Sequence, residues 1–150
     1  MAKKNATPGR IVNRRARYDY ELGDSLVVGL ELSGAEAKAL RMGHGQLRGA
    51  YVTEKSGELW LINAQITSSK GVPIAENDQT RSRKLLAKRR EIDSLMEAKQ
   101  NGNTIVPLEL LTGGRYIKLR IAVGRGKRQY DKRETLKRRQ QEREVRRVTR

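Results

Sequence analysis

The chain has 150 residues, no cysteine and a formal net charge of +16 at pH 7, with 36% hydrophobic and 33% charged residues. This length suits one domain with appended segments, and the absence of cysteine excludes disulfides and thiolate metal sites. The charge predicts an anionic partner. No apolar run reaches transmembrane length, and neither a signal-peptide core nor a lipidation signal is present, so we expect a cytoplasmic protein rather than a membrane-bound one.

The N-terminal part is predicted to contain a leader and two strands. Residues 1–10 are polar and basic, and we expect them to form a disordered basic leader before a folded domain at 11–124. In Ile11–Glu21, charged residues of one parity alternate with alanine and tyrosines of the other, which predicts a strand with one solvated face. The valine- and leucine-rich stretch Leu26–Leu32 predicts a second strand.

The next segment carries a helix-start signal followed by a hairpin pattern. Ser33 with Glu36 three residues later is a capping-box pattern, and it predicts a short helix that ends at Gly43. Ala50–Thr53 and Leu59–Ile66 are predicted strands joined by a turn that contains a serine and a glycine.

The middle of the chain is predicted to be a loop and then a helix. Thr67–Arg83 is polar and rich in turn-forming residues, so it predicts a loop. Arg81–Arg90 places six basic residues around two leucines. Ile92 and the apolar residues after it recur at helical spacing, which predicts a second helix closed by Asn101–Gly102.

The clearest local prediction is a hairpin of Thr104–Leu111 and Tyr116–Val123 across a Thr-Gly-Gly-Arg turn. Its expected inward residues are Val106, Leu108, Leu110, Ile117, Leu119, Ile121 and Val123, and Lys118 and Arg120 should point outward. The whole pattern predicts a mainly β protein with about six short strands and two or three short helices. Because short antiparallel strands protect their edges by closing, a small oligonucleotide-binding-like β-barrel is the expected architecture.

Catalytic and metal-binding residues are scarce in this sequence. His44 is the only histidine, and a lone turn histidine is typical of a solvated residue rather than a ligand. The glycine-rich stretch from Gly124 to Lys127 is not a phosphate loop, because it lacks the required frame and Arg128 stands where a serine or threonine should bind the metal. We therefore expect no enzyme activity, no cofactor and no metal site.

Basic residues gather in three sets, and these predict a nucleic-acid partner. The first lies at Arg14–Arg17, the second at Arg81–Arg90, and the third is a C-terminal tail at 125–150. From Gly124 onward the chain holds 12 of its 33 lysines and arginines but only 4 of its 17 acids. With few apolar residues to bury, this tail should become helical only when a polyanion neutralises it.

Trp60 is expected in the core.

Several blocks keep a common order and spacing along the chain: Asn13–Tyr20, Gly29–Leu32, Gly34–Arg41, Ala50–Val52, Trp60–Ala64, Arg81–Leu86, Thr104–Leu108 and Gly126–Arg133. Together these blocks resemble the SsrA-binding (tmRNA-binding) protein family, SmpB. The resemblance implies a bacterial factor of trans-translation, with an oligonucleotide-binding-like barrel that holds the tRNA-like domain of tmRNA. It also implies a tail that lies in the small-subunit decoding centre and the vacant mRNA channel and is helical there.

The resemblance also implies partners and site residues. The partners would be the ribosome and alanyl-charged tmRNA with the elongation factor, and the protein would be a monomer. The tmRNA-facing residues would be Asn13, Arg14, Arg15, Arg17, Arg41, Lys84, Leu86 and Lys118. The residues at the decoding site would be Lys127, Arg128, Tyr130, Asp131, Lys132 and Arg133, with Tyr130 stacked on a base and Asp131 capping the tail helix. Val27 departs from the family, which commonly has an acid there.

Two other functions fit the same features. A structural ribosomal protein or a general RNA chaperone on the same barrel would bind many RNAs alike and would keep its role without the tail. A small nuclease fits less well, because general-acid and metal-binding residues are lacking.

Overall fold

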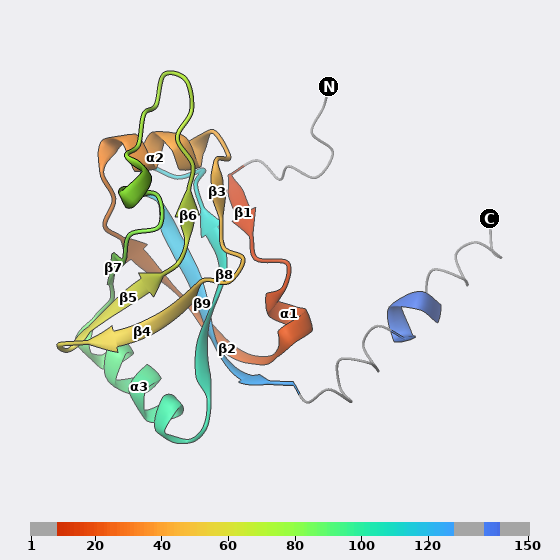
Figure 1. Cartoon of the computed structure of the whole chain (residues 1–150). Coiled ribbons are helices and arrows are strands. Elements are labelled where there is room, and N and C mark those ends of the chain that lie inside the picture. Colours follow the sequence, from red (N-terminus) through yellow and green to blue (C-terminus); the bar gives the residue numbers. More distant parts are fainter. Residues whose placement is uncertain (1–8, 128–136, 142–150) are drawn as a thin grey trace.

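A computed structural model describes residues 9–127 and 137–141 (Figure 1). Within this part, a seven-stranded antiparallel sheet has the order β1-β8-β9-β2-β7-β5-β4, and β3 pairs with β6 separately. The strands are β1 Arg10–Val12, β2 Tyr20–Leu30, β3 Gly45–Gln46, β4 Tyr51–Lys55, β5 Glu58–Ile62, β6 Gln65–Ile66, β7 Arg83–Leu86, β8 Thr104–Leu111 and β9 Lys118–Gly126. The helices of the folded domain are α1 Ala16–Asp19, α2 Gly34–Arg41, α3 Arg89–Gln100 and the 3₁₀ turn Glu76–Asp78.

The large sheet curls on itself, which confirms the predicted mainly β class. Its last strand, β4, comes to lie beside β8, so the two strands face each other across a seam. Helices α2 and α3 cover opposite ends of the curled sheet (Figure 1). Buried leucine, isoleucine and valine side chains fill the space inside, among them Leu40 from α2 and Ile92 from α3.

The capping box at the start of α2 is confirmed. The Ser33 hydroxyl accepts a hydrogen bond from the Glu36 amide at 3.2 Å, and the Glu36 carboxylate accepts one from the Ser33 amide at 2.9 Å. Gly43 then follows the helix with φ of +85°, a left-handed conformation that glycine adopts without a steric penalty.

Both predicted hairpins are present, but the strand expected at Leu59–Ile66 is divided into β5 and β6, with Asn63 between them at φ of 62°. Ser56 and Gly57, with φ of 55° and 81°, form the tight turn between β4 and β5. In the β8–β9 hairpin, Leu110 pairs opposite Leu119, and both side chains are buried. Leu108 was expected to point inward but is only half-buried, because a register shift between Pro107 and Glu109 interrupts the alternation of faces.

The single strand expected at Ile11–Glu21 is wrong. The structure divides this stretch into the end of β1, the short helix α1 and the start of β2. The Asn13 side chain accepts a hydrogen bond from the Arg15 amide at 3.3 Å, which favours a turn after β1, and Ala16 is buried there. A single turn of helix produced the same polar and apolar alternation as a strand.

Two further differences concern β7 and Trp60. Strand β7 lies in a stretch that was predicted as a loop followed by a basic cluster. The strand was not predicted because its interior positions, Arg83 and Leu85, include a charged residue and therefore do not show an apolar alternation. Trp60 is not a core residue: on β5 its neighbours Leu59 and Leu61 fill the interior, so the indole lies half-buried on the outer face. The alternation of side chains between the two faces of the strand therefore decides where Trp60 lies, rather than the hydrophobicity of the indole.

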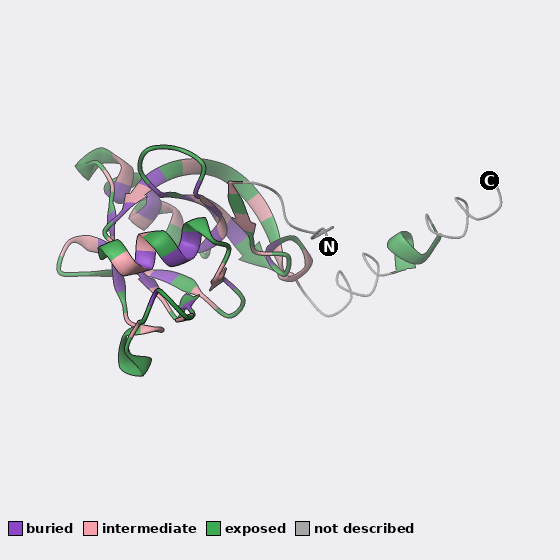
Figure 2. Cartoon of the chain, turned by 90° about the horizontal axis from the view of Figure 1, so that it is seen from above, coloured by how far each residue is buried: buried purple, intermediate pink, exposed green. Residues whose placement is uncertain are grey.

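In the C-terminal region, the structure describes residues 137–141, which are helical and exposed (Figure 2). The predicted decoding-site residues from Arg128 to Arg133 and the predicted capping box at Asp131 lie outside the described residues. No helix in the described ranges is long and apolar enough to cross a membrane.

Candidate nucleic-acid interface

The basic residues that are adjacent in the sequence at 81–90 have different environments. Arg83 is fully buried, although the sequence placed it in a solvent-facing basic set. Its guanidinium donates to the Glu36 carboxylate at 3.1 Å and to four backbone carbonyls, those of Ala64, Asp78, Gln79 and Arg81. Arg83 therefore joins α2, the turn between β5 and β6, and the loop before β7, and it cannot contact RNA.

Glu36 is the buried anion of this cluster. Burial raises its pKa, but hydrogen bonds from Arg81 and the Ser33 amide and the charges of Arg83 and Arg81 outweigh that effect and hold the pKa below its ordinary value. The carboxylate therefore remains charged, with both oxygens bonded. The sequence identified its capping role, and the ion pairs with two arginines add a second role that only the fold reveals.

Arg41 was expected on the tmRNA face, and the structure gives its guanidinium a set of protein partners. It donates to the carbonyls of Thr112 at 3.0 Å, Gly114 at 2.8 Å and Arg115 at 2.8 Å. Arg41 thus fastens the C-terminal end of α2 to the β8–β9 turn.

Strand pairing brings three distant residues into one row on the outer side of the sheet. Gly29 of β2 pairs opposite both Leu86 of β7 and Lys118 of β9. A Cβ atom at Gly29 would lie 3.1 Å from the Leu86 Cβ, so glycine leaves room for the leucine at this point. Leu86 itself is 53% exposed, which is unusual for a leucine within a strand and leaves an apolar side chain next to a lysine.

A second row lies beside the first. Val27 pairs opposite Arg120, and the Arg120 guanidinium donates to Glu109 of β8 at 3.0 Å. Arg10 of β1 pairs with the same carboxylate at 3.2 Å. On β7, Lys84 is two residues from Leu86 and is paired opposite Trp60. We call this surface the outer face; its residues are Arg10, Val27, Gly29, Trp60, Lys84, Leu86, Glu109, Lys118 and Arg120.

The segment Asn13–Arg17 follows β1 and is held by contacts within the protein. The Asn13 amide group donates to the Pro107 carbonyl at 2.8 Å, and the Arg15 guanidinium pairs with Asp19 at 3.4 Å. Arg14 and Arg17 are exposed and have no hydrogen bond or ion pair with the residues that the structure describes. These two guanidinium groups can therefore bind a polyanion without giving up a protein partner, whereas Arg15 is 53% exposed and would bind one beside its partner Asp19.

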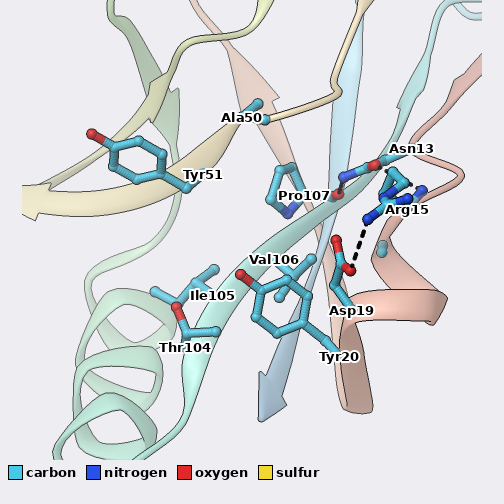
Figure 3. A pocket seen from close by; sticks show the side chains of 12 residues that line it. Asn13, Arg15, Asp19, Tyr20, Ala50, Tyr51, Thr104, Ile105, Val106 and Pro107 are labelled. Carbon is cyan, nitrogen blue, oxygen red and sulfur yellow. Dashed lines mark hydrogen bonds and ion pairs between the residues drawn. The ribbon is translucent and has the colours of Figure 1, made fainter. Parts of the chain in front are cut away.

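A groove of about 380 Å³ lies at the seam between β4 and β8 (Figure 3). Its floor is the β8 segment Thr104–Pro107, Tyr51 of β4 stands on one side, and Tyr20 and the Arg15–Asp19 pair stand on the other. No local sequence pattern indicates this groove, because it lies between two strands that are about fifty residues apart in the chain.

Histidine and carboxylate groups do not converge on a metal site within the described ranges. The His44 Nδ1 atom is buried and has no hydrogen-bond partner there. It adjoins a shallow hollow with Ser69, whose hydroxyl is also unpartnered.

The curled sheet with its basic and apolar outer face places the chain among the small β proteins with a surface suited to polyanions. The model of the family "SmpB protein" matches residues 10–150. The chain is 43% identical over 150 residues to the SsrA-binding protein of Coxiella burnetii (strain Dugway 5J108-111), a match that covers 99% of this chain and 94% of the relative. It is 39% identical over 137 residues to the SsrA-binding protein of Streptococcus thermophilus (strain ATCC BAA-491 / LMD-9), covering 91% and 89%.

A solved chain from work described as "tmRNA-SmpB: a journey to the center of the bacterial ribosome" is also similar. It superposes with a TM-score of 0.67 at 36% identity, over 85% of this chain and 94% of that one. The chain belongs to the SmpB family. The structure brings Lys84, Leu86 and Lys118 together on one face, places Asn13–Arg17 beyond the end of β1, and binds Arg41 to the β8–β9 turn.

Proposed function

We propose that this protein binds tmRNA and acts in trans-translation, the rescue of ribosomes stalled on messages without a stop codon. The observation that carries the proposal is the family match over residues 10–150, together with the similarity to a chain described with tmRNA and the bacterial ribosome. The protein would act as an adaptor without catalytic activity of its own.

The outer face supports the proposal through its chemistry. Lys84 and Lys118 present ammonium groups suited to phosphates, and Leu86 and Gly29 between them make an apolar step against which a ribose or base can lie. Because lysine contacts to phosphates position a nucleic acid without reading its sequence, shape recognition of a tRNA-like fold is the mode we expect. Arg14, Arg15, Arg17 and Asn13 would extend this contact past β1.

We further propose a division of labour along the chain, with a basic leader before β1, an RNA-binding barrel from β1 to β9 and a ribosome-binding tail after β9. The bounds expected from the sequence, 1–10, 11–124 and 125–150, shift slightly because Arg10 belongs to β1 and Gly126 to β9. The tail would enter the decoding site of the small subunit and the empty mRNA channel and be helical there. Its contact residues would be Lys127, Arg128, Tyr130, Asp131, Lys132 and Arg133. The protein would reach the ribosome as a cytoplasmic monomer on alanyl-charged tmRNA with the elongation factor.

A truncation tests the role of the tail. A chain that ends before Asp131 should keep near-full affinity for tmRNA but fail to support tagging of nascent peptides on stalled ribosomes, because the barrel is intact and the tail is missing. The measurements are tmRNA binding and peptide tagging in a reconstituted translation reaction. Normal tagging by the truncated chain would contradict the role proposed for the tail.

Competition binding tests the RNA partner. Labelled tmRNA bound to the full chain should resist an excess of bulk tRNA, because the outer face would recognise the shape of one tRNA-like domain. Equal displacement by tRNA would instead favour a general RNA chaperone or a structural ribosomal protein.

A further inference from the structure

The groove at the β4–β8 seam has unpaired backbone on its floor. Strand β8 pairs with β1 only over Glu109–Leu111, so the preceding residues Thr104–Val106 have a free edge on that side. Strand β4 ends the seven-stranded sheet, and no backbone hydrogen bond joins it to β8 within the described residues. Amide and carbonyl groups that face a hollow can hydrogen-bond to a ligand there.

Two tyrosines flank this edge. Tyr51 is 48% exposed on β4, and Tyr20 lines the same groove from the start of β2 (Figure 3). The Arg15 guanidinium is at the end of the groove, paired with Asp19. Aromatic rings beside free hydrogen-bonding groups and a guanidinium are the combination by which proteins hold a single unstacked base and its phosphate.

The groove also lies where the tail begins. Gly126, the last residue of β9, pairs opposite Tyr20, and the Lys127 amide donates to the Asp19 carbonyl at 2.9 Å. The tail therefore leaves the barrel beside the groove, so RNA that contacts the first tail residues passes within reach of Tyr20.

We propose that the seam groove binds one unstacked nucleotide of RNA, with the base against Tyr51 and Tyr20, its edge on the β8 backbone and its phosphate at Arg15. This rests on the proposed function, because it takes RNA as the partner. The groove has no lining residue in common with the outer face and adjoins the segment Asn13–Arg17, with which it shares Arg15. The outer face would hold a folded RNA surface, and the groove would hold a base that has left its stack.

A peptide strand added to β8 fits the groove less well. Pro107 has no amide hydrogen, and its carbonyl already accepts from Asn13, so the free edge is limited to three residues. Addition of a strand relies on a longer row of main-chain hydrogen bonds for its affinity. The charge of +16 also favours an anionic occupant.

Substitutions of Tyr51 test the site with short single-stranded RNA hexamers as probes, measured by fluorescence anisotropy at low salt. Tyr51→Ala should weaken binding between about fivefold and about a hundredfold, the loss expected for one stacked base. Tyr51→Phe keeps the ring and should bind like the unmodified protein. Tyr116→Ala is the matched control, since Tyr116 is a 69% exposed tyrosine on the β8–β9 turn. Equal binding by Tyr51→Ala and the unmodified protein would overturn the proposal.

Crosslinking identifies the occupant in the working complexes. A photoreactive phenylalanine analogue in place of Tyr51 should crosslink to RNA, either in the complex with tmRNA alone or only on the stalled ribosome, and these two results separate a tmRNA base from a ribosomal one. The same analogue in place of Tyr116 provides the background. Crosslinks from position 51 to protein, or none above that background, would overturn the site. If tmRNA still outcompetes tRNA in that case, only the groove is refuted and the proposed function stands.

Discussion

Arg83 and Arg14 look alike in the sequence, since each stands in a short run of basic residues, yet the fold gives them opposite roles. Arg83 is fully buried and bonded to Glu36 and to backbone carbonyls. Arg14, like Arg17, is exposed and makes no hydrogen bond or ion pair to the residues described. Some basic residues of this protein therefore hold the barrel together, and others remain available to a polyanion. Their hydrogen-bond and ion-pair partners within the protein, rather than their charge, distinguish the two kinds of arginine.

The largest expected effect is on stability, from Arg83→Ala. The substitution leaves Glu36 buried with only part of its pairing and frees several carbonyls, so the free energy of unfolding should fall by about 3–5 kcal/mol. Urea unfolding followed by circular dichroism measures the loss. Arg17→Ala is the control and should change stability by less than about 0.5 kcal/mol. Similar losses in both variants would refute the division between buried and exposed arginines.

A smaller effect is expected from Glu36→Gln, and it should depend on pH. The folded state lowers the pKa of Glu36, so the ionised carboxylate stabilises the fold above its unfolded pKa, near 4.5, and that stabilisation is lost as pH falls through the lower folded value. At pH 7 the substitution should cost about 1.5–3 kcal/mol, the range for hydrogen bonds to charged groups.

The matching measurement is unfolding of both proteins between pH 7 and pH 3. The unmodified protein should lose stability below about pH 4.5 more steeply than Glu36→Gln does. Parallel pH curves for the two proteins would show that Glu36 contributes nothing through its charge.

Substitution of the exposed arginines should change the affinity for RNA without changing the stability of the fold. Arg14→Ala with Arg17→Ala should reduce the slope of log affinity for tmRNA against log salt by about 1.4–1.8, because two phosphate contacts are lost. Filter binding over a range of salt concentrations gives the slope. An unchanged slope would remove both arginines from the interface.

The smallest and most selective effects are expected on the outer face. Lys118→Ala should lower the salt slope by about 1, whereas Leu86→Ala should weaken tmRNA binding and leave the slope unchanged, because its contact is apolar. Leu86 is 53% exposed, so its loss should barely affect stability. Identical salt slopes for the two variants would show that Lys118 makes no phosphate contact.

Local sequence signals predicted several elements correctly because they are decided by neighbours in the chain. The Ser33–Glu36 capping box and the β8–β9 hairpin depend on bonds or pairings within a few residues of a turn. The expectation for Ile11–Glu21 failed because a single helical turn and a strand give the same short alternation. Strand β7 was missed because Arg83, a charged residue, occupies an interior position that patterning reserves for apolar side chains.

The candidate site divides in the same way. The resemblance to a family named Lys84, Leu86 and Lys118 as candidates, but only pairing across β7, β2 and β9 shows that they lie on one face. Arg41 donates to three carbonyls on the β8–β9 turn, and the sequence around Arg41 gives no sign of these distant partners.

The mainly β class, the principal hairpins, the cap of α2 and the excess of positive charge can be predicted from the amino-acid sequence, because each follows from composition or from residues close together in the chain. The interior position of Arg83, the outward position of Trp60 and the groove between β4 and β8 are evident only in the folded protein. Burial and strand pairing depend on segments brought together from distant parts of the chain, so the sequence of one strand does not indicate which residues will pack against it.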